Sequence, residues 1–238
     1  EILVWKPFTY TVVDNHKNVN VAGNYYLTED VTSAGWQPLL INYGGTEGAV
    51  IRIDMNGHDI LGNGGRAIQT WAKPVFWLTN TSDKDSFVKG SIADHSGVVQ
   101  LVQITEFNVI GNVTIQNTGA NQPKNGGVMQ VAGTVNVYDG VIDGSLVNAT
   151  GVGSAFYIPG GASLNIYGGT INGGTAAVGS TIYADENANL TVSGGTITGS
   201  TDEISSVYIC ASANVAISGN ARITGNKGGN LDLTSGAT

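Results

Sequence analysis

The sequence has little charge, one cysteine and no long apolar run. Only 12% of its 238 residues are charged, and 18 acidic against 10 basic side chains give a net charge of −8. Lys and Arg form no cluster that could neutralise phosphates, which argues against a nucleic-acid partner and against docking to anionic lipid. No apolar stretch reaches the roughly 18 residues of a membrane span, so we expect no membrane insertion. The lone Cys210 excludes an internal disulfide framework.

What the chain does contain is glycine, 35 residues of it, in a composition that is 41% hydrophobic. With so few charges, the polar surface must consist of Thr, Ser, Asn and Gly. Helix surfaces favour Glu, Lys, Arg and Ala instead, whereas β-branched and turn residues favour short strands joined by corners. The composition therefore predicts an all-β protein that is large enough to bury a core.

A short pattern recurs in the C-terminal half of the chain. The stretches LNIYGGTING (164–173) and LTVSGGTITG (190–199) match each other, and VNVYDGVIDG (135–144) and VAISGNARITG (215–225) flank them. A second apolar strand precedes each copy, as VMQV, AFYI, TIYA and VYIC. Two independent strand signals that share a period of about 25–27 residues indicate a structural repeat.

Each period has room for three short strands and their corners, which make one coil of a parallel β-solenoid. Equivalent strands of successive coils would pair at a spacing of about 4.8 Å and bury the apolar faces that a single coil cannot bury. We therefore predict a single-stranded parallel β-helix with an N-terminal cap. Strand alternation then assigns two inward columns: Val131, Ile158, Ala184 and Cys210 in one, and Met129, Phe156, Ile182 and Tyr208 in the other. Three further inward columns begin at Val135, Val137 and Ile142.

The N-terminal half has the same character but is less regular. Alternating β runs lie at 38–45, 49–62, 74–80 and 98–117. A helical turn is predicted near residues 66–73, and Trp36, Trp71 and Trp77 are expected in the core of the cap and of the inserted segments. We divide the chain into an N-terminal cap with the first strands (1–35), irregular coils with inserted loops (36–127) and regular coils (128–238).

The stretch MNGHDILG (55–62) and the repeated GGTITG corners carry a family resemblance. Over about residues 39–230 the chain resembles the right-handed parallel β-helix domains of the pectate-lyase-like superfold, as found in secreted surface proteins of Gram-positive bacteria. The resemblance implies a right-handed helix, secretion, display at the cell surface, and adhesion or contact with glycans. Its motifs are core and corner residues, so they specify a fold and supply no reaction.

Acidic residues offer two sites for chemistry. Asp139 and Asp143 flank one glycine corner, and glycoside hydrolysis needs two carboxylates beside the scissile bond. The matching positions of the next coils carry no acid, which favours solvated corner acids over a catalytic pair. Asp185 and Glu186 lie in a loop where they could hold calcium together with backbone carbonyls, and the simpler interpretation is again solvated charge.

Aromatic residues offer a binding surface. Alternation places Tyr157 and Tyr183 at equivalent outward positions of adjacent coils, with Gln130 before them in the same row, and it places Tyr138 and Tyr167 likewise on the next face. Flat rings stacked at the coil spacing are platforms for sugar rings, because each tyrosine has an apolar face and a hydroxyl group. The alternative is that these rows only stabilise the sheet by stacking.

Together these features lead to a functional hypothesis with two alternatives. We expect a non-catalytic module of an extracellular, cell-surface bacterial protein, which mediates adhesion by binding a glycan or a host or cell-surface protein through one side face and the neighbouring loops. The alternatives are a polysaccharide-active lyase or glycoside hydrolase, and a structural stalk. We expect a monomer or one part of a larger multidomain chain, and no cofactor, with calcium at Asp185 and Glu186 as the weaker alternative.

Overall fold

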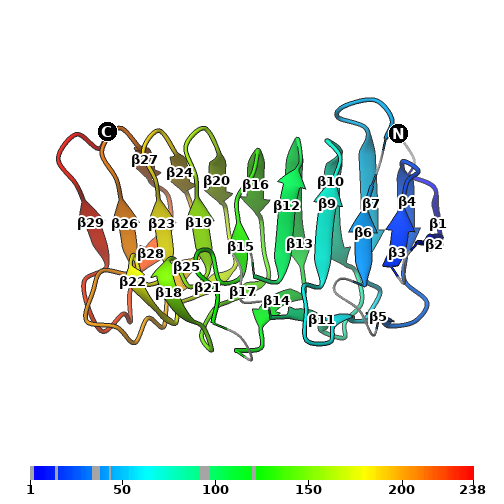
Figure 1. Ribbon diagram of the computed structural model, residues 1–238, viewed down its shortest axis with the longest axis horizontal. Helices are drawn as coiled ribbons and strands as arrows, with labels where there is room; N and C mark the ends of the chain where they lie inside the picture. Colours follow the sequence, from blue (N-terminus) through cyan, green and yellow to red (C-terminus); the bar gives the residue numbers. More distant parts are fainter. Residues whose placement is uncertain (1–2, 14–15, 34–37, 43, 92–96, 120–121) are drawn as a thin grey trace.

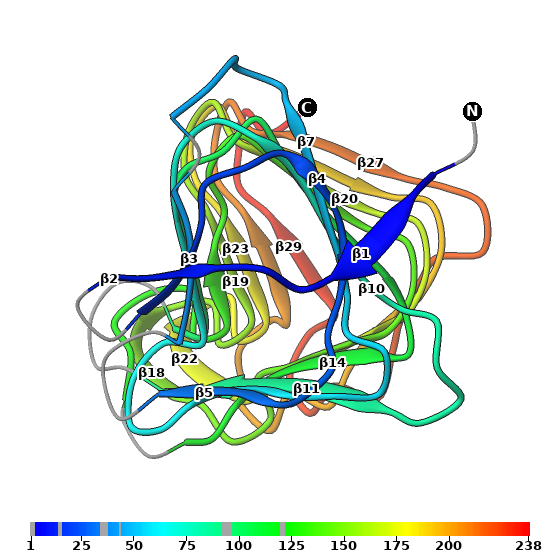
Figure 2. The same ribbon diagram turned by 90° about the vertical axis from the view of Figure 1, so that its right-hand side faces the viewer.

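The protein is an all-β, right-handed parallel β-solenoid of about 7 turns (Figure 1). The computed structural model describes residues 3–13, 16–33, 38–42, 44–91, 97–119 and 122–238, and these residues contain no helix. Figure 2 looks along the solenoid axis and shows that each coil has three sides. Each side contributes one strand to one of three long sheets, so the predicted fold class is confirmed.

The three sheets are named here by their strands. Sheet I contains, in spatial order, β1 (Trp5–Pro7), β4 (Gly23–Tyr26), β7 (Val50–Asp54), β10 (Val75–Asn80), β13 (Glu106–Gly111), β16 (Thr134–Val137), β20 (Ser163–Ile166), β24 (Asn189–Val192) and β27 (Asn214–Ile217). Sheet II contains β5 (Val31–Ser33), β8 (Ile60–Gly62), β11 (Ser86–Gly90), β14 (Val113–Asn117), β17 (Val141–Asp143), β21 (Thr170–Asn172), β25 (Thr196–Thr198) and β28 (Arg222–Ile223).

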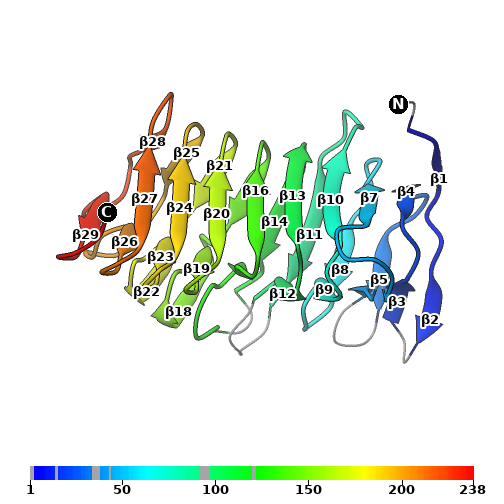
Figure 3. The same cartoon turned by 90° about the horizontal axis from the view of Figure 1, so that it is seen from above.

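Sheet III contains β2 (Thr11–Val13), β3 (His16–Val19), β6 (Leu39–Ile41), β9 (Ile68–Trp71), β12 (Val99–Gln103), β15 (Met129–Gln130), β19 (Phe156–Ile158), β23 (Ile182–Ala184), β26 (Val207–Ile209) and β29 (Leu231–Leu233). Figure 3 shows the strands of sheet I side by side along the axis. A short extra pair, β18 (Asn148–Val152) and β22 (Thr175–Val178), lies outside these sheets. Among the described strands, only β2 and β3 pair antiparallel.

The inward columns of sheets I and II stand as predicted. In sheet I the column that begins at Val135 continues one residue per coil, through Leu164, Leu190 and Val215. The column that begins at Ile142 in sheet II does the same, through Ile171, Ile197 and Ile223. Their members up to β25 are buried, and the core is therefore a stack of apolar layers.

The last predicted coil of sheet III was assigned one residue out of register. Ile209, and not Cys210, pairs with Ala184, and Val207, and not Tyr208, pairs with Ile182. Cys210 and Tyr208 therefore leave the inward columns to which the sequence pattern assigned them. The coil is one residue shorter than the coil before it. Sheet I shows the same shortening, since Leu164 aligns with Leu190 but Leu190 aligns with Val215, 25 residues on.

The corners after these strands of sheet III share one backbone feature. Gly161, Asn187 and Ser212 follow the strand ends at the same distance, and all three have positive φ angles of 81°, 61° and 62°. Glycine adopts this left-handed conformation without strain, and Asn tolerates it better than most residues. Ser212 is equivalent to Asn187 and Gly161 only if the last strand ends at Ile209, so the shared conformation agrees with the shorter coil.

The N-terminal half follows the same winding with longer strands and different corners. The segment predicted to hold a helical turn, residues 66–73, instead contains β9, which continues sheet III. Its alternating Ile68–Trp71 sequence matches a strand, because Ile68 is buried in the core and Trp71 is exposed. Strands β4 and β5, within the predicted cap at 1–35, already belong to sheets I and II, and the division of the chain into three segments stays a prediction.

Candidate ligand-binding face

One outward row runs along sheet III. It places a side chain from each of six neighbouring strands in lateral register: Gln69, Gln100, Gln130, Tyr157, Tyr183 and Tyr208. We call it the Gln/Tyr row. Gln69 is buried, and its amide nitrogen donates to the amide oxygen of Gln100, so these two glutamines are hydrogen-bonded at one end of the row. Sheet III, which carries the row, is the sheet turned to the viewer in Figure 1.

The tyrosines of the row stack on one another. Ring centroids lie 6.0 Å apart between Tyr157 and Tyr183, with an interplanar angle of 39°. Between Tyr183 and Tyr208 the centroids lie 5.5 Å apart and the rings are nearly parallel, at 4°. All three side chains are half-buried, so each ring packs on its neighbours and still presents an edge to solvent. The apolar edges of these fixed rings can contact the CH groups of a sugar ring.

Two tyrosine hydroxyl groups are held by residues of the following coil. The hydroxyl of Tyr157 donates to Oδ2 of Asp185 at 2.8 Å, and the thiol of Cys210 donates to the hydroxyl oxygen of Tyr183 at 3.0 Å. Burial, followed by the bond to Asp185, raises the pKa of Tyr157 to about 12. Burial also raises the pKa values of Tyr183 and of the Cys210 thiol. These groups therefore stay protonated at neutral pH and fix the orientation of the rings.

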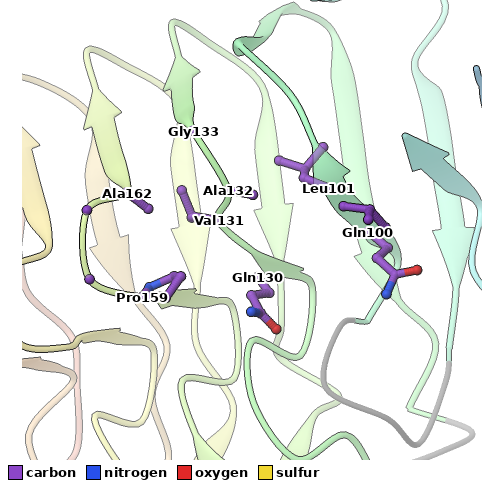
Figure 4. Close-up of a pocket in the computed structure, with 11 residues that line it drawn as sticks. Gln100, Leu101, Gln130, Val131, Ala132, Gly133, Pro159 and Ala162 are labelled. Carbon is purple, nitrogen blue, oxygen red and sulfur yellow. The ribbon is translucent and has the colours of Figure 1, made fainter. Parts of the chain in front are cut away.

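A recess of about 490 Å³ lies beside the glutamine end of this row. Figure 4 shows Gln100 and Gln130 on neighbouring strands, with Ala132 and Pro159 on the connections that lead to sheet I. The hollow forms because residues 131–133, which join β15 to β16, bear only small side chains beyond Val131. Two amide side chains thus face an open concave surface, an arrangement that can donate to and accept from hydroxyl groups.

The second predicted tyrosine pair lies on a different sheet. Tyr138 and Tyr167 directly follow β16 and β20 of sheet I, and their rings stack at 5.0 Å and 14°. Trp77 extends this stack, at 5.8 Å and 9° from Tyr138. Burial raises the pKa of Tyr138, with a smaller effect of Tyr167. The five predicted binding residues are therefore not brought together: Gln130, Tyr157 and Tyr183 share sheet III, and this second pair does not.

The two corner acids have different surroundings. Asp139 is exposed, as expected, and its Oδ1 accepts from the backbone nitrogen of Gly140 at 2.8 Å. Asp143 was predicted to be solvated, but it is buried. Its carboxylate accepts from Nε2 of Gln116 at 2.7 Å and from the backbone nitrogen of Ser145 at 3.0 Å. Each carboxylate has a local structural partner, and the catalytic alternative stays a prediction.

The predicted calcium ligands lie beside the Gln/Tyr row. Asp185 accepts from the Tyr157 hydroxyl and, through Oδ1, from the backbone nitrogen of Glu186 at 2.9 Å. Glu186 is exposed. Within the described ranges, no three His, Cys, Asp or Glu side chains come close enough to hold one metal ion. A calcium site at Asp185 and Glu186 therefore stays a prediction.

Several residues of this face were not predicted from the sequence. Gln69 and Gln100 occupy the middle of the segments IQT and VQL, as Gln130 does in MQV, and the three triplets share one apolar–Gln–apolar pattern apart from the threonine. Tyr208 could have been found by aligning FYI, IYA and VYI on their common tyrosine. Trp71 is exposed and not part of the core, and Trp77 is half-buried in the aromatic stack; Trp36 lies outside the described residues.

A comparison of the chain with protein-family models, with curated proteins and with solved structures found no match. In the part of the chain that the structure describes, no helix is long and apolar enough to span a membrane.

Proposed function

We propose that the protein is a non-catalytic module that binds glycan chains along the outer face of sheet III. The observation that carries this proposal is the Gln/Tyr row, in which amide and aromatic side chains follow one another on six strands beside a recess of about 490 Å³. Strand pairing spaces these side chains by about 4.8 Å. Glycans are also repeating polymers, so a periodic row can contact several units of one chain.

The chemistry of the row favours a sugar over a protein partner. The exposed edges of the stacked rings offer apolar CH groups to a pyranose, and the neighbouring amides can bond its hydroxyl groups. The large apolar patch that marks many protein interfaces is missing from the described part of this row, because its non-aromatic members are glutamines. We keep a host or cell-surface protein as the alternative partner.

The place where this binding would act follows from the resemblance of the sequence. β-Helix domains of that kind belong to secreted bacterial surface proteins, and we propose the same extracellular location and adhesive role for this chain. The low content of charge and the regular stack of coils suit a module that holds a binding face at a distance from its attachment.

Binding can be tested with a matched pair of tyrosine variants. Immobilised glycans would be screened first, and the affinity for the strongest ligand measured by calorimetry. Tyr183→Ala, in the centre of the tyrosine stack, should weaken binding about tenfold, which corresponds to about 1.4 kcal/mol. Tyr167→Ala removes a 45% exposed ring from sheet I and should leave the affinity unchanged.

Circular dichroism of both variants would establish that the coils remain intact. Equal affinities of Tyr183→Ala and the unaltered protein would place the binding site elsewhere. Loss of binding in Tyr167→Ala alone would assign it to the stack of Trp77, Tyr138 and Tyr167 instead. If the unaltered protein bound no glycan, the proposal would be wrong.

A further inference from the structure

Trp71 is an exposed aromatic residue that lies outside the Gln/Tyr row. It is the last residue of β9, two positions after Gln69, and strand alternation directs both side chains to the outside of sheet III. With 51% of its surface exposed, Trp71 presents far more area than the half-buried tyrosines. A tryptophan contributes to stability when it is buried, and this one is not, so its packing alone does not account for it.

A second recess, of about 390 Å³, surrounds this tryptophan. Polar side chains line it, among them Asn42 and Gln103. Nζ of Lys73 lies 3.4 Å from Oε2 of Glu47 in the same lining, so the two charges compensate each other. The recess therefore combines one flat ring with hydrogen-bonding groups and no net charge, which suits an uncharged hydroxylated ligand.

A β-bulge in β12 joins this recess to the one beside the glutamines. Leu101 pairs with Thr70 and Gln103 pairs with Trp71, so Val102 is an extra residue between them. The hydroxyl of Thr70 donates to the backbone oxygen of Gln103 at 2.9 Å and fixes the bulge. Bulges often redirect side chains next to functional sites.

As a result, β12 contributes to both recesses. Gln100, Leu101 and Val102 line the larger one, and Gln103 lines the one at Trp71. Both recesses open along the corner where the chain passes from sheet III to sheet I. The two hollows are thus consecutive along one edge of the sheet.

We infer that the recess at Trp71 is a second sugar-binding subsite, which extends the proposed site and takes a neutral glycan. This inference depends on the proposed function. From the strand of Trp71 to that of Tyr208 there are five strand-to-strand steps, from β9 to β26, which span about 24 Å at about 4.8 Å each. Only an oligosaccharide of several units covers that length, so the subsite selects long chains.

Charge selects the class of glycan. Beside the tyrosines lie the carboxylates of Asp185 and Glu186, and the cation at the other end, Lys73, is already paired with Glu47. The carboxylates of a polyuronate would therefore be repelled by Asp185 and Glu186 at one end. At the other end, the charge of Lys73 is already compensated by Glu47. Neutral hexose polymers carry no such penalty.

The test uses neutral β-linked glucose and mannose oligosaccharides of increasing length, with galacturonate oligomers of the same lengths for comparison. Affinity for the neutral series should rise with length and level off once a chain reaches Trp71. Trp71→Ala should weaken binding of the longest chains about tenfold and leave the disaccharide unaffected. Trp71→Phe, which keeps a ring, should retain most of the affinity for long chains.

Two controls separate this inference from the proposed function. Tyr183→Ala should weaken binding of short and long chains alike, because it alters the shared part of the site. Tryptophan fluorescence should shift when a long neutral chain is added to the unaltered protein and should not shift in the Trp71→Ala variant.

Three results would overturn the subsite or its ligand class. If Trp71→Ala bound long chains normally while Tyr183→Ala did not, the proposed function would stand and the subsite would not. Tighter binding of galacturonate oligomers than of neutral ones would overturn the ligand class. Normal binding by both variants would overturn the subsite and the location of the proposed face together.

Discussion

The corner between sheets I and II is built in two ways along the solenoid. In the N-terminal coils, buried polar side chains hold it: Asp54 accepts from the backbone nitrogens of Asn56 and Thr81, at 2.9 and 3.0 Å. In the C-terminal coils, glycines with positive φ turn the same corner, for example Gly169 at 75° and Gly195 at 74°. The N-terminal corner also contains a glycine with positive φ, Gly57 at 77°, and differs by adding side-chain hydrogen bonds between coils.

The two kinds of corner make different contacts with the neighbouring coil. A glycine corner needs only its own residue and leaves no space for a side chain, since a Cβ atom at Gly169 would lie 2.5 Å from the backbone oxygen of Gly140. The backbone of the neighbouring coil therefore has to keep a fixed position at this corner. An Asp or Asn corner bridges residues of two coils through a side chain, as Asn80 does when Oδ1 accepts from the nitrogen of Gly57 at 3.0 Å.

The largest expected effect comes from matched core substitutions in the two halves. Phe107→Ala and Phe156→Ala each remove a fully buried ring and should lower the free energy of unfolding by about 3–5 kcal/mol. The N-terminal variant should lose more, because the ring of Phe107 stacks on that of Phe76 at 5.2 Å. Urea unfolding measures both, with Leu233→Ala, 52% exposed, as the control. A greater loss for Phe156→Ala would reverse this ranking.

A carboxylate corner should be sensitive to loss of its acceptor. Asp54→Ala leaves two partly buried backbone donors without their partner, which we expect to cost about 1–3 kcal/mol of unfolding free energy. Asp139→Ala in a glycine corner removes an exposed side chain and should change stability by less than about 0.5 kcal/mol. Thermal denaturation of the two variants makes the comparison, and equal losses would show that Asp54 is not needed for its corner.

A glycine corner should be sensitive to added volume. Gly169→Ala combines a left-handed residue with the contact to Gly140 and should cost about 1–3 kcal/mol. Gly161→Ala has a similar φ of 81° but no atom within 4 Å of the added Cβ, so only the strain of about 1 kcal/mol remains. If the two variants unfolded at the same temperature, close contact between coils would not restrict this corner.

The smallest effect concerns the tyrosine stack at high pH. Burial and Asp185 raise the pKa of Tyr157 from 10.0 to about 12. Because the folded state holds this proton more tightly, its contribution to stability is complete below pH 10 and is lost as the pH rises through about 12. The protein should therefore lose stability across that interval, and Tyr157→Phe should lose less of it. Denaturation at several alkaline pH values tests this, with Tyr167→Phe as the control; an unchanged slope in Tyr157→Phe would contradict it.

Periodicity predicted most of the fold because core positions repeat. The Val135 and Ile142 columns follow directly from the copies of the GGT corner, where the same residue types return in every coil. The predicted register of Cys210 was wrong because the prediction assumed coils of equal length, whereas this coil is one residue shorter than the one before it. The apolar sequence VYIC allows either register, and only pairing with the adjacent strand decides between them.

The candidate site was predictable only in part. Tyr157 and Tyr183 were found because they lie within regular repeats. Trp71 was assigned to the core because an apolar residue in an irregular segment gives no sign of which side it faces. Its exposure follows from the continuation of sheet III through β9 and from the bulge at Val102, and both depend on strands that are distant in sequence.

The hydrogen bonds of the tyrosine hydroxyl groups have a mechanical consequence. Tyr157 and Tyr183 each reach forward to the next coil, to Asp185 and Cys210, so neighbouring turns are fastened on the outside as well as through the core. A polymer bound across the same turns would resist their separation under a pulling force, because separating the turns would also break its contacts. Binding of the polymer would therefore stabilise the folded coils against unfolding.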